Sequence, residues 1–423
     1  MILIQGGRVI DTERNQEKTA DVVLKDGIIA GIGDYRDDGS YEQVIDASGC
    51  VVAPGLVDVH VHFRDPGLTY KEDIQTGAGA AAAGGFTTVV CMANTKPAAD
   101  CAEIVKYVIR EGEKTGIHVL TCAAVSVGMK GQELTDMEKL REAGAAGFTD
   151  DGIPLMNGEL LRRAMEKARE LDVPVSLHEE DPSFIRNNGI HHGEAAKQLG
   201  IYGSPAIAED SLVARDCMIA LDTGAKVNIQ HISSVKAVEA VRQAKKMGAK
   251  VTAEVTPHHI TLTEEAVLQY GTLAKMNPPL RTEEDRRALI KGLLDDTIDI
   301  IATDHAPHSR EEKEKPLTEA PSGIIGLETS LALMITELVD KGYMTMARLM
   351  AKMSLNPARL YGLECGRMAE GAPADLVIFN PDESFTVQKF CSKARNSPFT
   401  GWTLKGRVHY TICQGKVVYR NVL

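Results

Sequence analysis

The chain reads Val51-Val-Ala-Pro-Gly-Leu-Val-Asp-Val-His60-Val-His62-Phe-Arg64 where its pattern changes from short β pieces to longer repeating units. The apolar run Val51–Val57 is typical of a buried strand, and it would place both histidines at the strand's carboxyl end. Side chains alternate between the two faces of a strand, so His60 and His62 point the same way. This stretch therefore predicts a shared metal-binding position at the end of one strand.

Seven further apolar runs follow, and helical patterns alternate with them. The eight runs end near His62, Ala93, Ala124, Asp151, His178, His231, Thr256 and Asp304, and the helix candidates span 71–83, 104–114, 157–171, 211–221, 235–247 and 282–294. Eight strand–helix units over about 300 residues favour a (β/α)8 TIM barrel over an open doubly wound sheet. No Gly-x-Gly-x-x-Gly motif follows the first strand, which argues against a dinucleotide-binding fold.

The two ends of the chain contain short β-like pieces separated by turn residues. Neither end offers enough strands for a stable sheet by itself, so we expect the two ends to combine. A chain of 423 residues is also long for a single core. The predicted architecture is α/β, with a barrel at 54–361 and a small β-sandwich domain built from 1–53 plus 362–423.

The composition argues against two classes of partner. The chain carries 47 Lys and Arg against 59 Asp and Glu, a formal charge of −12, and has no basic segment suited to nucleic acid. It has no apolar stretch of membrane-spanning length and no signal-peptide pattern at its N-terminus. Its eight cysteines are scattered without a Cys-x-x-Cys pair, as in reduced cytosolic proteins. We expect a cytoplasmic protein that binds neither nucleic acid nor membrane.

Metal-ligand residue types end five of the eight predicted strands. They are His60 and His62 on the first, Asp151 on the fourth, His178 on the fifth, His231 on the sixth and Asp304 on the eighth. The carboxyl ends of barrel strands meet at one rim, so these side chains are expected to converge. The set exceeds the needs of one tetrahedral zinc and suits two metal ions that share a bridging carboxylate and hydroxide. Asp304 is the candidate acid/base, because it can accept the hydroxide's proton and pass it to a leaving nitrogen.

Six segments, in order, resemble the class I dihydroorotases of the amidohydrolase superfamily. They are Asp58–Gly67, Cys91–Thr95, Gly147–Gly152, Met276–Arg281, Ala302–His308 and Ala320–Gly323. The resemblance covers essentially the whole chain, and it implies a (β/α)8 barrel with a small β-sandwich made from both termini. It also implies the reversible cyclisation of N-carbamoyl-L-aspartate to L-dihydroorotate, the third step of de novo pyrimidine (UMP) synthesis.

The resemblance also implies the arrangement of the metal ligands. Two Zn²⁺ ions per subunit are expected, with His60, His62 and Asp304 on the first and His178 and His231 on the second. Many relatives bridge the metals with a carboxylated lysine, but no Lys lies between Lys139 and Lys167 here, so an Asp is the expected bridge. We favour Asp151 over Asp150, because the matched motif places the ligand just before Gly152 and adjacent strand residues face opposite ways. Mn²⁺ or Co²⁺ could fill the same nitrogen and oxygen ligands.

The implied substrate is a small anionic ring, whose carboxylate needs a fork-like cationic donor. Arg64 lies just beyond the histidine pair and can supply this donor. By the resemblance, the other substrate-binding residues are His62, Asn94, Asn277, His308, Ser322 and Gly323. The backbone near Pro321–Gly323 is expected to contact the polar edges of the ring. The mixed-charge run Ser309–Lys315 is typical of a solvated surface, and its place before Gly323 also fits a loop over the site.

Two alternatives to this function remain. A hydantoinase or allantoinase would use the same metals on another ring, but Arg64, Asn94 and His308 favour a substrate that carries a carboxylate. A non-catalytic dihydroorotase-like partner of aspartate transcarbamoylase would lack metal ligands, whereas all six positions are filled here. A homodimer and an association with aspartate transcarbamoylase are both compatible with the sequence.

Overall fold

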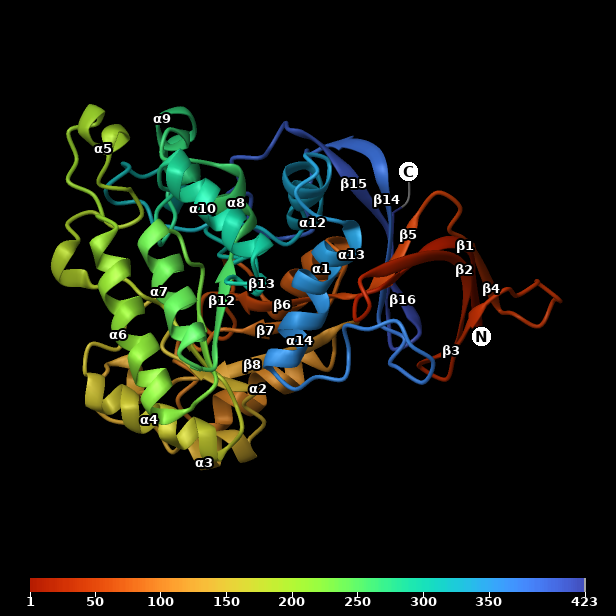
Figure 1. The fold of residues 1–423 in the computed structure, drawn as a ribbon, viewed down its shortest axis with the longest axis horizontal. Coiled ribbons are helices and arrows are strands. Elements are labelled where there is room, and N and C mark those ends of the chain that lie inside the picture. The colour runs from red at the N-terminus through yellow and green to blue at the C-terminus, as the bar shows by residue number, and fades with distance from the viewer. Residues whose placement is uncertain (422–423) are drawn as a thin grey trace.

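The computed structural model describes residues 1–421 of the chain. Two eight-stranded sheets organise these residues, one parallel and the other mixed. In Figure 1 the parallel sheet and its helices fill the left and centre of the view, and the strands from both ends of the chain lie at the right. This arrangement confirms the predicted α/β fold, a TIM barrel with a small β unit. None of the helices within 1–421 has the length and apolar content that spanning a bilayer requires.

The barrel consists of eight parallel strands in sequence order. They are β6 (Leu56–Val61), β7 (Phe86–Cys91), β8 (His118–Ala123), β9 (Gly147–Thr149), β10 (Val175–Leu177), β11 (Val227–Ile229), β12 (Val251–Val255) and β13 (Ile300–Ile301). A parallel bridge between Val61 and His305 brings the segment after β13 back to β6. The strand residues are mostly apolar and almost entirely buried, as expected for a parallel sheet covered by helices. The predicted strand ends lie one to three residues beyond the observed ones.

Helices form the outer layer of the barrel, and all six predicted ones are present. They are α1 (Ile74–Ala83), α2 (Ala102–Gly112), α4 (Gly158–Glu170), α6 (Ile207–Thr223), α7 (Val235–Lys246) and α10 (Glu283–Leu294). Shorter helices lie in the loops and after β13: α3 (Met137–Glu142), α5 (Glu194–Gln198), α8 (Pro257–Thr261), α9 (Ala266–Tyr270), α11 (Arg310–Lys313), α12 (Ser330–Met334), α13 (Met346–Met350) and α14 (Asn356–Leu360). Side-chain caps fix several of their starts; for example, Asn157 accepts the N–H groups of Glu159 and Leu160 at α4.

The apolar run Val51–Val57 forms two strands, not the single strand predicted. Its first part, β5 (Val51–Pro54), pairs with strands of the mixed sheet, whereas β6 begins at Leu56 in the barrel. A side chain at Gly55 would collide with Thr87, so the backbone passes close to β7 at this point. The Pro-Gly pair therefore carries the chain from one sheet to the other, and the two histidines still follow a barrel strand.

The mixed sheet joins strands from both ends of the chain. It contains β1 (Ile2–Asp11), β2 (Gln16–Lys25), β3 (Ile28–Gly33), β4 (Gln43–Asp46), β5, β14 (Leu376–Thr386), β15 (Thr403–Cys413) and β16 (Lys416–Arg420). The first half of β1 pairs with β4 and its second half with β5, so the sheet forks at β1. It encloses its own apolar core, which includes Val22, Val52 and Ile412.

The segment between β14 and β15 returns to the barrel rim. Its residue Asn396 donates hydrogen bonds to the carbonyl groups of Ala306 and Gly323, at 3.0 and 3.1 Å. The oxygen of its amide accepts the N–H of His308 at 3.1 Å. The C-terminal part of the chain thus supports the rim where the candidate site lies, and the domain limits stated above stay a prediction.

Candidate metal centre and active site

The six predicted ligand side chains meet at the carboxyl end of the barrel. His60 lies in β6, and the others lie within three residues of a strand end: His62, Asp151, His178, His231 and Asp304. Each of the six residues is at most 8% exposed. The structure therefore brings together all the side chains that the strand-end pattern selected.

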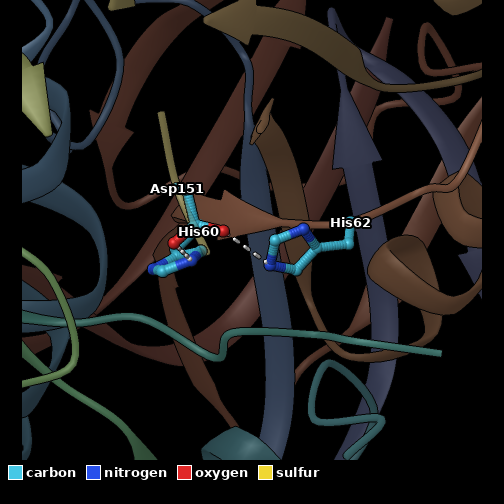
Figure 2. Close-up of side chains that lie close together, drawn as sticks. All are labelled: His60, His62 and Asp151. Carbon is cyan, nitrogen blue, oxygen red and sulfur yellow. Dashed lines mark ion pairs between the residues drawn. The ribbon is translucent and has the colours of Figure 1, made fainter. Parts of the chain in front are cut away.

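His60 and His62 face the carboxylate of Asp151 (Figure 2). Nε2 of His60 lies 3.3 Å from Oδ1 of Asp151, and Nε2 of His62 lies 3.4 Å from its Oδ2. Asp304 joins this group, with Oδ1 2.9 Å from Nε2 of His62 and 3.5 Å from Nε2 of His60. Ligands about 2.0 Å from a tetrahedral zinc lie roughly 3.3 Å from one another. The separations in this group fit such a metal ion.

A second group, His178 and His231, shares the same aspartate. Nδ1 of His178 lies 3.0 Å from Nε2 of His231, and these two atoms lie 3.7 and 3.9 Å from Oδ1 of Asp151. The other ring nitrogen of His178 contacts the carboxylate of Glu180 at 3.2 Å, an arrangement that leaves Nδ1 available to bind a metal ion. Oδ1 of Asp151 is buried without a hydrogen-bond partner among the described residues. A cation among these atoms would satisfy all of them.

The charges around the site also favour a cation. Burial opposes a charge on His60, yet Asp151 and Asp304 raise its pKa well above the usual value. Burial likewise opposes a charge on His178, but the nearby carboxylates of Asp151 and Glu180 raise its pKa to about 10. Burial acts to raise the pKa of Asp151, but His60 and its neighbours hold that pKa well below the usual range. The carboxylates thus stabilise positive charge at this place, which is what a metal ion supplies.

Asp150, the rival for the bridging position, points elsewhere. Its carboxylate accepts the N–H groups of Val125 and Ser126 at 2.8 and 3.1 Å, and also the hydroxyl group of Ser126. These bonds hold the loop after β8. Only Asp151 of the two faces the histidines, in agreement with the choice that we favoured, and its role as a metal bridge stays a prediction.

Three of the predicted site residues that carry a Cβ have a left-handed backbone. The φ angles are 60° at Arg64, 32° at His231 and 48° at Asp304. Residues with a Cβ rarely adopt this conformation because it costs free energy, and such residues gather at functional sites. The backbone here is held in an unfavourable conformation that aims the side chains at the rim.

Arg64 and Asn94 border the metal ligands. The oxygen of the Asn94 side chain contacts Nδ1 of His62 at 2.9 Å, and its nitrogen donates to the carboxylate of Asp151 at 3.3 Å. Arg64 uses only Nε, which donates to the carbonyl of Pro307 at 3.2 Å; within residues 1–421 its two terminal nitrogens have no hydrogen-bond partner. Arg64 follows His62 by two residues; burial lowers the pKa of its guanidinium, and the negative charges of Asp304 and Asp151 oppose that effect. An unpaired guanidinium fork beside the site is suited to a carboxylate.

The remaining predicted substrate residues lie around the segment Pro321–Gly323. Oδ1 of Asn277 and Oγ of Ser322 are buried without hydrogen-bond partners among the described residues. His308 differs, because both its ring nitrogens have protein partners: Nε2 lies 2.8 Å from the Ser322 carbonyl and Nδ1 lies 3.3 Å from Nζ of Lys71. A substrate carboxylate would have to replace one of these bonds, so the direct contact predicted for His308 stays a prediction.

The sequence reasoning missed the groups that orient the metal ligands. Glu254, fully buried on β12, places Oε2 3.0 Å from Nδ1 of His60, and Asn228 donates to its other carboxylate oxygen. Glu180 orients His178 in the same way. Carboxylates behind metal-binding histidines fix the ring and its tautomer. The signal was present, because Glu254 is the only charged residue of the buried strand Val251–Val255.

Comparisons with known proteins agree with this site. A family model described as dihydro-orotase-like matches residues 49–237, and an amidohydrolase family model matches residues 328–419. A dihydroorotase of Clostridioides difficile (strain 630) is 59% identical over 419 residues, which cover 99% of this chain and 100% of that protein. A dihydroorotase of Clostridium acetobutylicum is 50% identical over 423 residues, 100% of both proteins.

Solved structures with the same fold include cyclic amide hydrolases. The L-hydantoinase (dihydropyrimidinase) from Arthrobacter aurescens has a TM-score of 0.89 and 26% identity, over 100% of this chain and 97% of that one. The D-hydantoinase (dihydropyrimidinase) from Thermus sp. has a TM-score of 0.84 and 26% identity, over 99% of this chain and 95% of that one. Because the two curated relatives match it along its whole length at 50% identity or more, the chain belongs to the dihydroorotase family of metal-dependent cyclic amide hydrolases.

Proposed function

We propose that the chain is a dihydroorotase, which catalyses the reversible cyclisation of N-carbamoyl-L-aspartate to L-dihydroorotate in de novo pyrimidine synthesis. The observation that carries this proposal is the guanidinium fork of Arg64, two residues after His62, whose terminal nitrogens have no hydrogen-bond partner within residues 1–421. Both substrate and product carry a carboxylate, whereas hydantoin and allantoin do not. A cationic fork next to the metal ligands therefore favours the anionic ring over these neutral rings.

Two zinc ions per subunit fit the donor set. We propose that His60, His62 and Asp304 hold one ion, that His178 and His231 hold the other, and that Asp151 bridges them. Bound zinc would polarise the ring amide carbonyl and make hydroxide available near neutral pH. The buried, unpaired Oδ1 of Asp151 supports this assignment, because it faces ligand atoms from both groups.

Asp304 is proposed to move the proton of the reaction. In the hydrolytic direction its carboxylate takes the proton from the attacking hydroxide and donates it to the departing ring nitrogen. In the cyclisation direction it removes a proton from the carbamoyl nitrogen, which closes the ring on the carboxyl carbon, and returns that proton to the oxygen that leaves this carbon as hydroxide. Its side chain is 12% exposed, against 4% for Asp151, so it can reach a ring that lies over the metal ligands. Arg64 binds the substrate carboxylate, and Asn277 and Ser322 offer unpaired polar atoms to the ring.

The proposal predicts both substrate preference and metal dependence. We expect purified protein to turn over dihydroorotate far faster than hydantoin or allantoin, because only the first has a carboxylate for Arg64. Chelation should abolish turnover, and added Zn²⁺, Mn²⁺ or Co²⁺ should restore it. Rates measured on the three rings, before and after chelation, test both points. Preferential turnover of allantoin would overturn the substrate assignment, and activity that resists chelation would overturn the metal assignment.

Glu254 gives a separate prediction about metal affinity. The substitution Glu254→Gln replaces the charged acceptor of the His60 ring with a neutral amide, so the ring becomes a poorer ligand. We expect the affinity for metal to fall by about 10- to 100-fold. Metal content after dialysis against graded chelator concentrations measures this change. Glu328→Gln is the matched control, because that glutamate accepts the N–H groups of Cys391 and Ser392 and contacts none of the ligands. Equal metal retention in the two variants would contradict the orienting role.

Three parts of the proposal concern assembly and location. A homodimer, an association with aspartate transcarbamoylase and a location in the cytoplasm stay predictions of the sequence. The scattered cysteines support the location, since they suit a reducing compartment. Size-exclusion chromatography of the protein, alone and mixed with aspartate transcarbamoylase, measures the other two.

A further inference from the structure

Two buried lysines lie next to the segment predicted to read the edges of the substrate ring. Lys275 is 1% exposed and Lys313 is 6% exposed. Within residues 1–421, neither forms an ion pair with a carboxylate, although Glu312 is the neighbour of Lys313 in sequence. Burying an ammonium group without a counter-ion costs free energy, so lysines are rarely found in such places. We refer to Lys275 and Lys313 as the lysine pair.

The lysine pair donates to four backbone carbonyl groups of residues 317–323, which we name the reading segment. Nζ of Lys275 lies 2.8 Å from the carbonyl of Leu317 and 2.7 Å from that of Ala320. Nζ of Lys313 lies 2.9 Å from the carbonyl of Pro321 and 3.2 Å from that of Gly323. The ammonium groups thus donate the hydrogen bonds that backbone carbonyl groups usually accept from N–H groups in helices and sheets.

The hydrogen bond from Lys313 to the Pro321 carbonyl also fixes the direction of the Ser322 N–H group. In a trans peptide the C=O and N–H groups point in opposite directions, so the N–H of Ser322 points away from Lys313 when the Pro321 carbonyl points toward it. Within the described chain, this N–H has no hydrogen-bond partner. Oγ of the same residue is also buried and unpaired. The two unpaired polar groups of Ser322 call for a ligand at the reading segment.

Keeping the lysine pair charged costs free energy, and holding the four carbonyl groups does not by itself require charged donors. Burial and the nearby Lys275 lower the pKa of Lys313 to about 7, against the opposing charge of Glu312. Burial also lowers the pKa of Lys275. Neutral donors could hold the same carbonyls without this cost. An anionic ligand, however, favours the protonated form of both lysines and gains from their positive charge behind the backbone that binds it.

We propose that Lys275 and Lys313 are positioning residues that aim the Ser322 N–H at the substrate ring and add positive potential for its carboxylate. The inference rests on the proposed function and deepens it, because it states how the reading segment favours an anionic ring. Arg64 contacts the carboxylate from the side of β6, whereas the lysine pair acts through the backbone of the reading segment. Discrimination against neutral rings then has two separate sources.

Lysine-to-methionine substitutions test the proposal, since they keep the length and apolar stem of the side chain. We expect Lys275→Met and Lys313→Met each to raise KM for dihydroorotate by about tenfold or more, with kcat and bound metal changed much less. Lys352→Met is the matched control. Lys352 is also buried, at 2% exposure, and donates to the carbonyl of Ile298 at 2.6 Å, at the amino end of β13. We expect its KM to be unchanged.

Two further measurements separate this inference from the proposed function. Hydrogen exchange of peptides covering 317–323 should speed up in both lysine-pair variants and not in Lys352→Met, whatever the substrate is. Binding of dihydroorotate should weaken more than binding of dihydrouracil, which is the same ring without the carboxylate. Thermal unfolding identifies the folded variants, and Lys313→Gln serves as a shorter neutral substitute at the same position. Unchanged KM and unchanged exchange in a folded lysine-pair variant would overturn the inference.

Discussion

We expect Asp304→Asn to lower kcat for dihydroorotate by about a thousandfold or more, while the protein keeps its metal. The amide has the same shape but cannot accept a proton at neutral pH, and removal of a general acid/base costs about 10²- to 10⁴-fold. Its carbonyl oxygen can still face Nε2 of His62, which Oδ1 of Asp304 approaches at 2.9 Å. The other ligands, including Asp151, are unchanged. We therefore expect the variant to lose turnover while its metal stays bound.

Steady-state rates in both directions, together with metal content by elemental mass spectrometry, measure this effect. Asp58→Asn is a matched control in the same part of the barrel. Asp58 is buried on β6, and its Oδ1 accepts the N–H groups of His60 at 3.0 Å and Thr303 at 3.3 Å, which one amide oxygen can also accept. Burial raises its pKa to about 7, so the neutral amide changes little. If Asp304→Asn turned over substrate at a rate near that of the unchanged protein, Asp304 would have no acid/base role.

The sequence predicted the barrel and its rim because both depend on local patterns. Buried parallel strands are short apolar runs, and a strand's direction fixes which end of the barrel its last residue reaches. His178 could therefore be placed beside His231 although 53 residues separate them. The split at Gly55 could not be predicted in this way, because Val51–Pro54 and the start of β6, Leu56 and Val57, are equally apolar and all are buried. Only their partner strands differ.

Features that depend on distant contacts escaped prediction. The run Ser309–Lys315 has the charge pattern of a solvated surface, and Arg310 and Glu314 are indeed exposed. Lys313 is buried, because residues 317–323 fold back over it and supply carbonyl groups. Likewise, the partner of Asp150 is a loop that lies 24 residues earlier in the chain. The pattern of neighbouring residues in the sequence does not predict such contacts.

Fold alone does not separate a dihydroorotase from a hydantoinase, because structures of hydantoinases share this architecture along the whole chain. The metal ligands do not separate them either, since both activities open a cyclic amide. Substrate choice must then come from groups around the ligands. For this chain we propose the fork of Arg64 and the lysine pair behind residues 317–323 as these groups. In this proposal both add positive charge near the substrate carboxylate.

Asp151→Asn is expected to have the second large effect, the loss of metal together with about a thousandfold or greater loss of turnover. Among the described residues, Asp151 is the one carboxylate whose oxygens approach ligand nitrogens of both groups, from 3.3 Å at His60 to 3.9 Å at His231. An amide offers one oxygen in place of two and carries no charge. It cannot bridge two cations, so both ions should bind more weakly.

Asp150→Asn is the matched control, since the two aspartates are adjacent and equally buried, at 3% exposure each. Asp150 holds the backbone of Val125 and Ser126, so its replacement should lower the free energy of unfolding by about 1 to 2 kcal/mol and leave metal bound. Metal content after dialysis and urea unfolding curves of both variants distinguish the two roles. The opposite result, metal lost from Asp150→Asn and kept by Asp151→Asn, would assign the bridge to Asp150. It would then require the strand end to rotate on metal binding, because only one of two adjacent strand residues can face the rim at a time.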